Sequence, residues 1–373
     1  MDDVLIRRSL PFRIAYVSKA GKILEIKPHA AIPGGEVMIE CAGLDTSEPS
    51  RCAVLIDGEV ASVVALSSKR ALAVVPDFKQ NNFSWRSQRE AKPGSGLTVD
   101  VVVESQGEQS APASFIMGRR LAEDLHPVAN PAFDPDDGSL FITRSGSRGE
   151  QLPVSIFRID ANGELNEFSG DILNPTGIAF DNEGQMFVTS RLDGTVYRIT
   201  PFKEALPFAT NLGVATGLAF DKDNQMYVGD RTGTIFKVNE IGEDKSWAQL
   251  EPSVSAYHLA WGPDDALYVA GPTVTSYDSI TRIDRDGTPS VFYRGLGRPQ
   301  GLAFDADGNL YVAATLRGRR GIVRIAAGTK EGELFVSGMN LVGLAFSSLG
   351  DMIVASNDSV YTVPVGVLGA LLS

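Results

Sequence analysis

A short segment recurs along the chain after residue 124. In its clearest copy, PTGIAFDNEGQMFVTSRLDGTVYRIT at 175–200, three short apolar runs alternate with polar turns rich in Asp, Asn and Gly. Such alternation is typical of an antiparallel meander. One meander cannot bury both of its faces, so copies of it must stack on one another. The first runs begin 40 to 47 residues apart, at Asn130, Gly177, Gly217, His258, Gly301 and Gly343.

This spacing predicts a ring of four-stranded sheets. The repeat has the length of one β-propeller blade, and closing the ring removes the exposed edges that an open sheet would leave. We therefore expect an all-β fold in which residues 125–373 form a six-bladed propeller. Either residues 365–372 or residues upstream of Leu125 supply the outer strand of the last blade, and the sequence leaves both possibilities open.

The segment before the repeats predicts a separate domain. Residues 23–118 contain short apolar runs such as EVMIECAGL and LTVDVVVES, with turn signals such as PGG and DG between them. This is the pattern of an immunoglobulin-like sandwich of two antiparallel sheets. Residues 1–22 are expected to form an N-terminal arm or an edge strand. The linker at 119–124 is so short that the two domains should touch.

Both parts resemble known families. The stretches IKPHAAIPGGEVMIECAGL, VLIDGEVASVVALSS and ALAVVP resemble the TIG (IPT) family of immunoglobulin-like domains. The stretches NPTGIAFDNEGQMFVTS, ATGLAFDKDNQMYVGD and RPQGLAFDADGNLYVAAT resemble the NHL and gluconolactonase-type propellers, which include the senescence-marker and strictosidine-synthase-like proteins. The resemblance implies a sandwich followed by a six-bladed propeller. Because that architecture carries hydrolases, lyases and pure binding proteins, it implies no single activity.

The resemblance also implies a metal site that can be compared with this sequence. Gluconolactonase-like propellers hold a divalent cation through oxygen ligands placed just before each inner strand. The residues at those positions here are Ala129, Thr176, Thr216, Tyr257, Gln300 and Val342. None is a carboxylate, and calcium without an acidic ligand would hardly recover the cost of its dehydration. No cofactor is therefore predicted, and calcium stays possible only at a site unlike the family's.

The polar residues expected nearest the axis are Asn130, Thr176, Thr216, Tyr257, His258 and Gln300. Two interpretations stay open. In the first, the threonines and Gln300 satisfy backbone groups and channel water while Tyr257 and Val342 fill the pore. In the second, they form a neutral, hydrogen-bonding mouth for a small ligand, whose specificity comes from Tyr257, His258 and Gln300.

Arginines gather in the loops on one face of the predicted ring. The acidic turns, such as DNEG at 181–184, join the first and second strands and so belong to the other face. The candidate arginines of the opposite mouth are Arg144, Arg191, Arg231, Arg298 and Arg317. They predict a cationic mouth that recognises an anionic ligand or an acidic protein surface. Chance turn composition is the alternative.

Composition limits the function classes. A net charge of −12 and a pI near 4.8 argue against a nucleic-acid-binding protein. The sequence has no apolar run of membrane-spanning length. As written it predicts a cytoplasmic protein, or a periplasmic or secreted one if a signal peptide was removed. The leading hypothesis is a binding or scaffold protein, without a nominated catalytic residue, that recognises a small anionic ligand or a protein partner. The alternative is a gluconolactonase-like hydrolase with a rearranged channel site.

Overall fold

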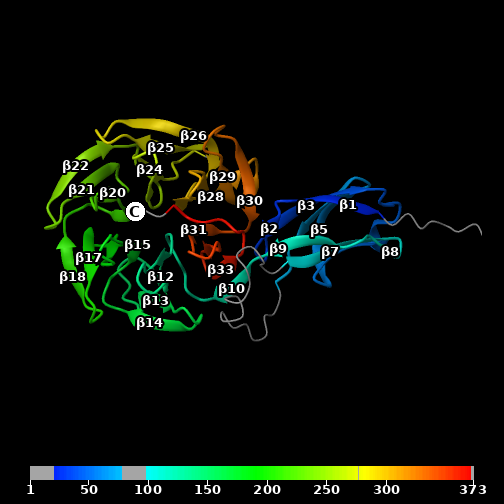
Figure 1. The fold of residues 1–373 in the computed structure, drawn as a ribbon, viewed down its shortest axis with the longest axis horizontal. Coiled ribbons are helices and arrows are strands. Elements are labelled where there is room, and N and C mark those ends of the chain that lie inside the picture. Colours follow the sequence, from blue (N-terminus) through cyan, green and yellow to red (C-terminus); the bar gives the residue numbers. More distant parts are fainter. Residues whose placement is uncertain (1–20, 78–97, 276, 371–373) are drawn as a thin grey trace, which may run out of the picture.

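The computed structural model describes residues 21–77, 98–275 and 277–370. These residues form β-strands and loops, with one 3₁₀ turn at Pro49–Arg51. Figure 1 shows a ring of sheets with a smaller group of strands beside it. The all-β prediction is confirmed. The predicted arm at 1–22 lies outside the described residues except for its last two.

The smaller group contains the first nine strands. Alternating burial along β3 and β7 places Val37, Ile39, Val101 and Val103 in one apolar cluster with Phe115. Strand β5 pairs with both β4 and β6. The strands are β1 (Lys22–Lys27), β2 (Ala30–Ala31), β3 (Glu36–Ala42), β4 (Cys52–Ile56), β5 (Glu59–Ser67), β6 (Arg70–Val74), β7 (Thr98–Ser105), β8 (Glu108–Gln109) and β9 (Ala113–Met117).

The repeats fold into four-stranded antiparallel units in a propeller-like arrangement (Figure 1). The first three units are β11 (Ala132–Phe133), β12 (Leu140–Thr143), β13 (Ile156–Ile159) and β14 (Leu165–Ser169); β15 (Pro175–Phe180), β16 (Met186–Ser190), β17 (Thr195–Ile199) and β18 (Ala205–Ala209); and β19 (Ala215–Phe220), β20 (Met226–Asp230), β21 (Thr234–Val238) and β22 (Asp244–Gln249). The first strand of each unit contacts the first strand of the next, so these strands surround the axis.

The remaining repeats continue the pattern. Their strands are β23 (His258–Trp261), β24 (Leu267–Ala270), β25 (Asp278–Ile283) and β26 (Pro289–Gly297); β27 (Leu302–Phe304), β28 (Leu310–Leu316), β29 (Arg319–Ile325) and β30 (Gly332–Ser337); and β31 (Leu341–Phe346), β32 (Met352–Ser356) and β33 (Val360–Val363). Strand β26 also pairs with β28, which joins two neighbouring units.

The unit that contains β31 to β33 is completed by a strand from before the ring. Strand β10 (Arg119–Ala122) pairs antiparallel with β33. Residues 364–370 instead run toward the neighbouring unit, where the Ala370 N–H donates to the carbonyl oxygen of Phe304 at 2.9 Å. Of the two possibilities that the sequence left open, the upstream strand closes the sheet.

Aromatic residues pack between successive units. In five units, all but the one that contains β32, an aromatic side chain of the second strand lies between one from its own outer strand and one from the next inner strand, with ring centroids 4.8 to 5.6 Å apart. These contacts explain the repeated aromatic residues of the first and second runs. The groups are Phe168–Phe141–Phe180, Phe208–Phe187–Phe220, Trp247–Tyr227–Trp261, Phe292–Tyr268–Phe304 and Phe335–Tyr311–Phe346.

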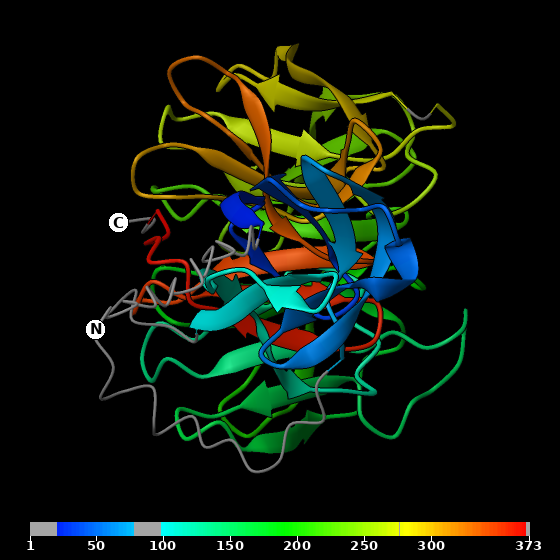
Figure 2. The same ribbon diagram turned by 90° about the vertical axis from the view of Figure 1, so that its right-hand side faces the viewer.

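The smaller group of strands is joined to the outer edge of the ring (Figures 1 and 2). Strand β2 pairs in parallel with both β30 and β9, so it forms a continuous ladder between the two parts. Ile32, 1% exposed, packs among side chains of the ring. Arg319 Nη2 donates to the carbonyl oxygens of Lys27 at 2.9 Å and Glu36 at 3.0 Å. Arg319, part of the arginine-rich run at 317–320, is thus an interface residue.

We expect Arg319→Met to lower the free energy of unfolding by about 2 kcal/mol, because hydrogen bonds from a charged donor to two carbonyl groups are lost. Urea denaturation followed by circular dichroism measures the change. Arg317→Met is the matched control, since Arg317 is exposed and makes none of the hydrogen bonds or ion pairs found among the described residues. Equal denaturation midpoints for the two variants would contradict a role for Arg319 in joining the two parts.

Candidate functional site

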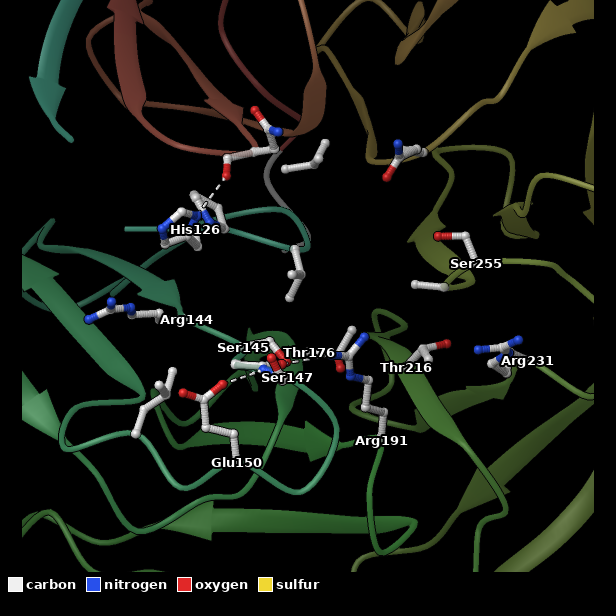
Figure 3. A pocket seen from close by; sticks show the side chains of 18 of the residues that line it. His126, Arg144, Ser145, Ser147, Glu150, Thr176, Arg191, Thr216, Arg231 and Ser255 are labelled. Carbon is white, nitrogen blue, oxygen red and sulfur yellow. Dashed lines mark hydrogen bonds between the residues drawn. The ribbon is translucent and has the colours of Figure 1, made fainter. Parts of the chain in front are cut away.

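A cavity of about 610 Å³ opens at one end of the axis. It is formed where the inner strands begin and where loops join second to third strands (Figure 3). Its wall combines arginine side chains with hydroxyl and amide groups. The lining residues are His126, Pro127, Val128, Arg144, Ser145, Gly146, Ser147, Glu150, Leu152, Thr176, Arg191, Thr216, Arg231, Val254, Ser255, Ala256, Gln300, Val342 and Asn357.

Arg191 and Arg231 supply positive charge to this cavity. Figure 3 shows the Arg191 guanidinium directed toward its centre. Burial first, and then the charge of Arg231, hold the pKa of Arg191 below its usual value. Among the residues that the structure describes, no carboxylate forms an ion pair with Arg144, Arg191 or Arg231. The cavity is therefore lined by three guanidinium groups and by the carboxylate of Glu150, none of these arginines forms an ion pair with a described residue, and Arg191 and Arg231 lie close enough for their charges to interact.

A buried asparagine shapes the adjoining loop. Asn174, 1% exposed, donates through Nδ2 to the carbonyl oxygens of Gly146 at 2.9 Å and Ser147 at 2.8 Å. Its Oδ1 accepts from the Gly149 N–H at 2.8 Å. Arg191 Nη2 also donates to Gly146, at 3.1 Å. The loop is thus held by Asn174 independently of Arg191, and sequence analysis did not nominate Asn174, because these bonds connect loops of neighbouring repeats.

The hydroxyl groups of the wall divide by their hydrogen bonding. Thr216 Oγ1 donates to the Gly229 carbonyl oxygen at 3.1 Å and accepts from the Tyr257 N–H at 3.0 Å. Thr216 therefore satisfies backbone groups, as in the first of the two interpretations. Ser255 also lines the cavity; its backbone N–H donates to Ser253 Oγ at 3.2 Å, and no described residue hydrogen-bonds to its own hydroxyl. Gln300 also lines the wall, and no described residue hydrogen-bonds to its side-chain amide.

The other predicted mouth residues lie elsewhere. Tyr257 is 3% exposed within an apolar cluster, where its hydroxyl donates to the Glu251 carbonyl oxygen and burial raises its pKa to about 12. Arg298 lines a smaller hollow beside the cavity, and Arg317 lines none of these hollows. The predicted mouth thus retains Arg144, Arg191, Arg231, Thr176, Thr216 and Gln300.

Asn130 and His258 lie in the wall of a second cavity, at the other end of the inner strands. Asn130 Nδ2 donates to the Leu302 carbonyl oxygen at 2.9 Å, and its Oδ1 accepts from the Leu344 N–H at 3.1 Å. Asn130 therefore connects two neighbouring inner strands. The second cavity also borders Asp181 and Asn182 of an acidic turn, whereas the first cavity borders the three arginines. Asp181 and Asn182 thus lie at the opposite end of the inner strands from Arg144, Arg191 and Arg231.

One carboxylate, Glu150, and one imidazole, His126, line the first cavity. Glu150 Oε2 accepts from the Ser147 N–H at 2.7 Å, and His126 Nδ1 lies 3.3 Å from the Asn357 carbonyl oxygen (Figure 3). Among the described residues, no three His, Cys, Asp or Glu side chains are grouped so that they could hold an ion. Nor does the described part of the chain contain a helix with the length and apolarity of a membrane crossing.

Comparison with known proteins supports the fold. No family model and no curated protein matches the chain. Among solved structures, an auxiliary nutrient binding protein from Bacteroides ovatus is 15% identical with a TM-score of 0.51, over 93% of this chain and 98% of that chain. The likeness is one of fold. A gluconolactonase from Xanthomonas campestris is 17% identical with a TM-score of 0.53, over 66% of this chain and 89% of that chain. This chain thus has the propeller-like arrangement of gluconolactonase-like proteins.

Proposed function

We propose that this chain is a ligand-binding protein, built as a TIG-like sandwich and a six-bladed propeller of the NHL and gluconolactonase type. The ligand is a small polyhydroxylated anion, such as a sugar acid or a sugar phosphate, held in the first cavity. The observation that carries the proposal is the pair Arg191 and Arg231, which line one cavity without a carboxylate partner among the described residues.

Electrostatics favour an anion at this place. Burial, and after it repulsion from Arg231, disfavours the charged form of Arg191 in the empty site and holds its pKa below the usual value. A carboxylate or phosphate group would relieve this repulsion and accept charge-assisted hydrogen bonds, often in a bidentate arrangement. The pair therefore suits an oxyanion better than a neutral group.

The remainder of the wall favours hydroxyl groups on the ligand. The Gln300 amide can both donate and accept, and the Ser255 hydroxyl can do the same. A volume of about 610 Å³ lies within the usual range of small-molecule sites. A concave site of this size suits a small ligand better than the flat surface of a protein partner.

The likeness to known folds supports binding in general terms. The structure described as a nutrient binding protein matches 93% of this chain, including the strands before the ring, whereas the gluconolactonase matches 66% of it. A gluconolactonase-like hydrolase with a rearranged site is the second candidate, and the likeness to the gluconolactonase favours it. Calcium, manganese or zinc should raise the thermal unfolding midpoint of a metal-dependent hydrolase and leave that of the binding protein unchanged.

Calorimetric titration with D-glucuronate, glucose 6-phosphate and D-glucose tests the proposal. We expect at least one of the two anions to bind, and neutral D-glucose to bind at least about 10-fold more weakly, because it cannot form charge-assisted hydrogen bonds. Raising the salt concentration should weaken anion binding and leave any D-glucose binding unchanged. Equal affinity for the anions and D-glucose, or no binding of any of the three, would contradict it.

A further inference from the structure

The second cavity differs in chemistry from the first. Its volume is about 690 Å³, and the two cavities share no lining residue. Alanines of the inner strands, among them Ala179, Ala260 and Ala303, form much of its wall together with aromatic residues of the same strands. Gly369 and Ala370 of the C-terminal segment border it on one side. Its polar lining residues are Asn130, Asp181, Asn182 and His258, and the rest of the wall consists of glycine, proline and apolar or aromatic residues.

Closely packed inner strands lie between the two cavities. A Cβ atom on Gly301 would come within 2.0 Å of Asn130 Oδ1, and one on Gly217 within 2.5 Å of the Tyr257 carbonyl oxygen. The repeat glycines are therefore required where neighbouring strands approach each other. His258 occupies the same repeat position and places an imidazole ring there.

His258 carries a polar atom that the described chain leaves unsatisfied. Its side chain is 3% exposed, and Nε2 is buried without a hydrogen-bond partner. Burial lowers the pKa of His258 to about 4, so the ring is neutral at pH 7, with one nitrogen that donates and one that accepts. Asn130, the other polar residue at this level, has partners for both ends of its amide. A buried polar atom without a partner costs free energy and calls for a water or a ligand group.

We propose that the second cavity binds a neutral, largely apolar small molecule whose single hydroxyl group hydrogen-bonds to His258. A volume of about 690 Å³ accommodates a ligand of two or three fused rings. Apolar alanine and aromatic walls favour such a ligand by the hydrophobic effect. A hydroxyl group pairs with either tautomer of His258, because it can donate or accept. This site is independent of the anion site in the first cavity.

The test compares 2-naphthol with naphthalene, which has the same rings without the hydroxyl group. Fluorescence titration of the full chain should show 2-naphthol bound about fivefold to tenfold more tightly than naphthalene, as expected for one hydrogen bond to a buried group. His258→Phe keeps an aromatic ring but has no ring nitrogen. We expect it to reduce 2-naphthol affinity to that of naphthalene and to leave naphthalene affinity unchanged.

A second variant tests the cavity without changing His258. Ala303→Trp places a large side chain in the wall and should abolish binding of both probes, while thermal unfolding shows that the variant remains folded. D-Glucuronate should not displace 2-naphthol, because it belongs to the other cavity. Failure of the wild-type chain to bind either probe would overturn the proposal. Equal affinity of the wild-type chain for 2-naphthol and naphthalene would also overturn it, because the ligand hydroxyl group would then form no hydrogen bond with His258.

Discussion

The double substitution Arg191→Met and Arg231→Met is expected to weaken binding of D-glucuronate at least about 100-fold. Each arginine offers a charge-assisted hydrogen bond, and losing one such bond typically costs a factor of about 10 or more in affinity. Both side chains line the same cavity, and neither forms an ion pair with a described residue. Substituting them therefore breaks no ion pair within the described chain. Isothermal titration calorimetry at low salt measures the effect.

The loop beside Arg191 should keep its shape in this variant, because Asn174 holds it through three hydrogen bonds. The matched control is Arg298→Met with Arg317→Met, which removes the same charge outside the first cavity. This control should change affinity by no more than about twofold, since screened surface charges contribute little. If both double variants weaken binding equally, net charge rather than the cavity attracts the anion.

The second large effect concerns closure of the ring. A chain of residues 124–373, which lacks β10, should be less stable than one of residues 119–373 by about 3 to 6 kcal/mol. The difference combines lost ladder hydrogen bonds to β33 with lost burial of Leu121 and Ala122. That is a large part of the stability of an ordinary domain. Thermal unfolding followed by circular dichroism should show a midpoint lower by about 10 °C or more.

The comparison is matched because both chains lack β1 to β9 and therefore lose the same contacts with β30. Without β10, the unpaired edge of β33 should also promote self-association, which size-exclusion chromatography detects. If the two chains have the same midpoint and both remain monomeric, another segment completes the last sheet. Residues 364–370 would be that segment, which would contradict their position against Phe304.

The sequence by itself determined the repeating strands and the faces of several loops. Strand order within each repeat follows from apolar runs and turns that depend on neighbours close in sequence. Arg144, Arg191 and Arg231 follow the second strands of their repeats, so their common end of the axis was predictable. The domain boundaries and the six-blade count remain predictions, whereas the proposal for the anion site rests on the residues that line the first cavity.

Tertiary structure decided what depends on contacts between repeats. Two apolar segments were equally suited to complete the last sheet, and only packing against β33 distinguished them. Tyr257, Asn130 and His258 have similar places in the repeat, yet one is core, one connects strands and one retains an unpaired nitrogen. The hydrogen-bond partners of a buried polar group come from neighbouring units that are distant in sequence. The repeat period does not predict which of those residues will be the partners. For that reason the residues were predictable, whereas their division between two cavities was not.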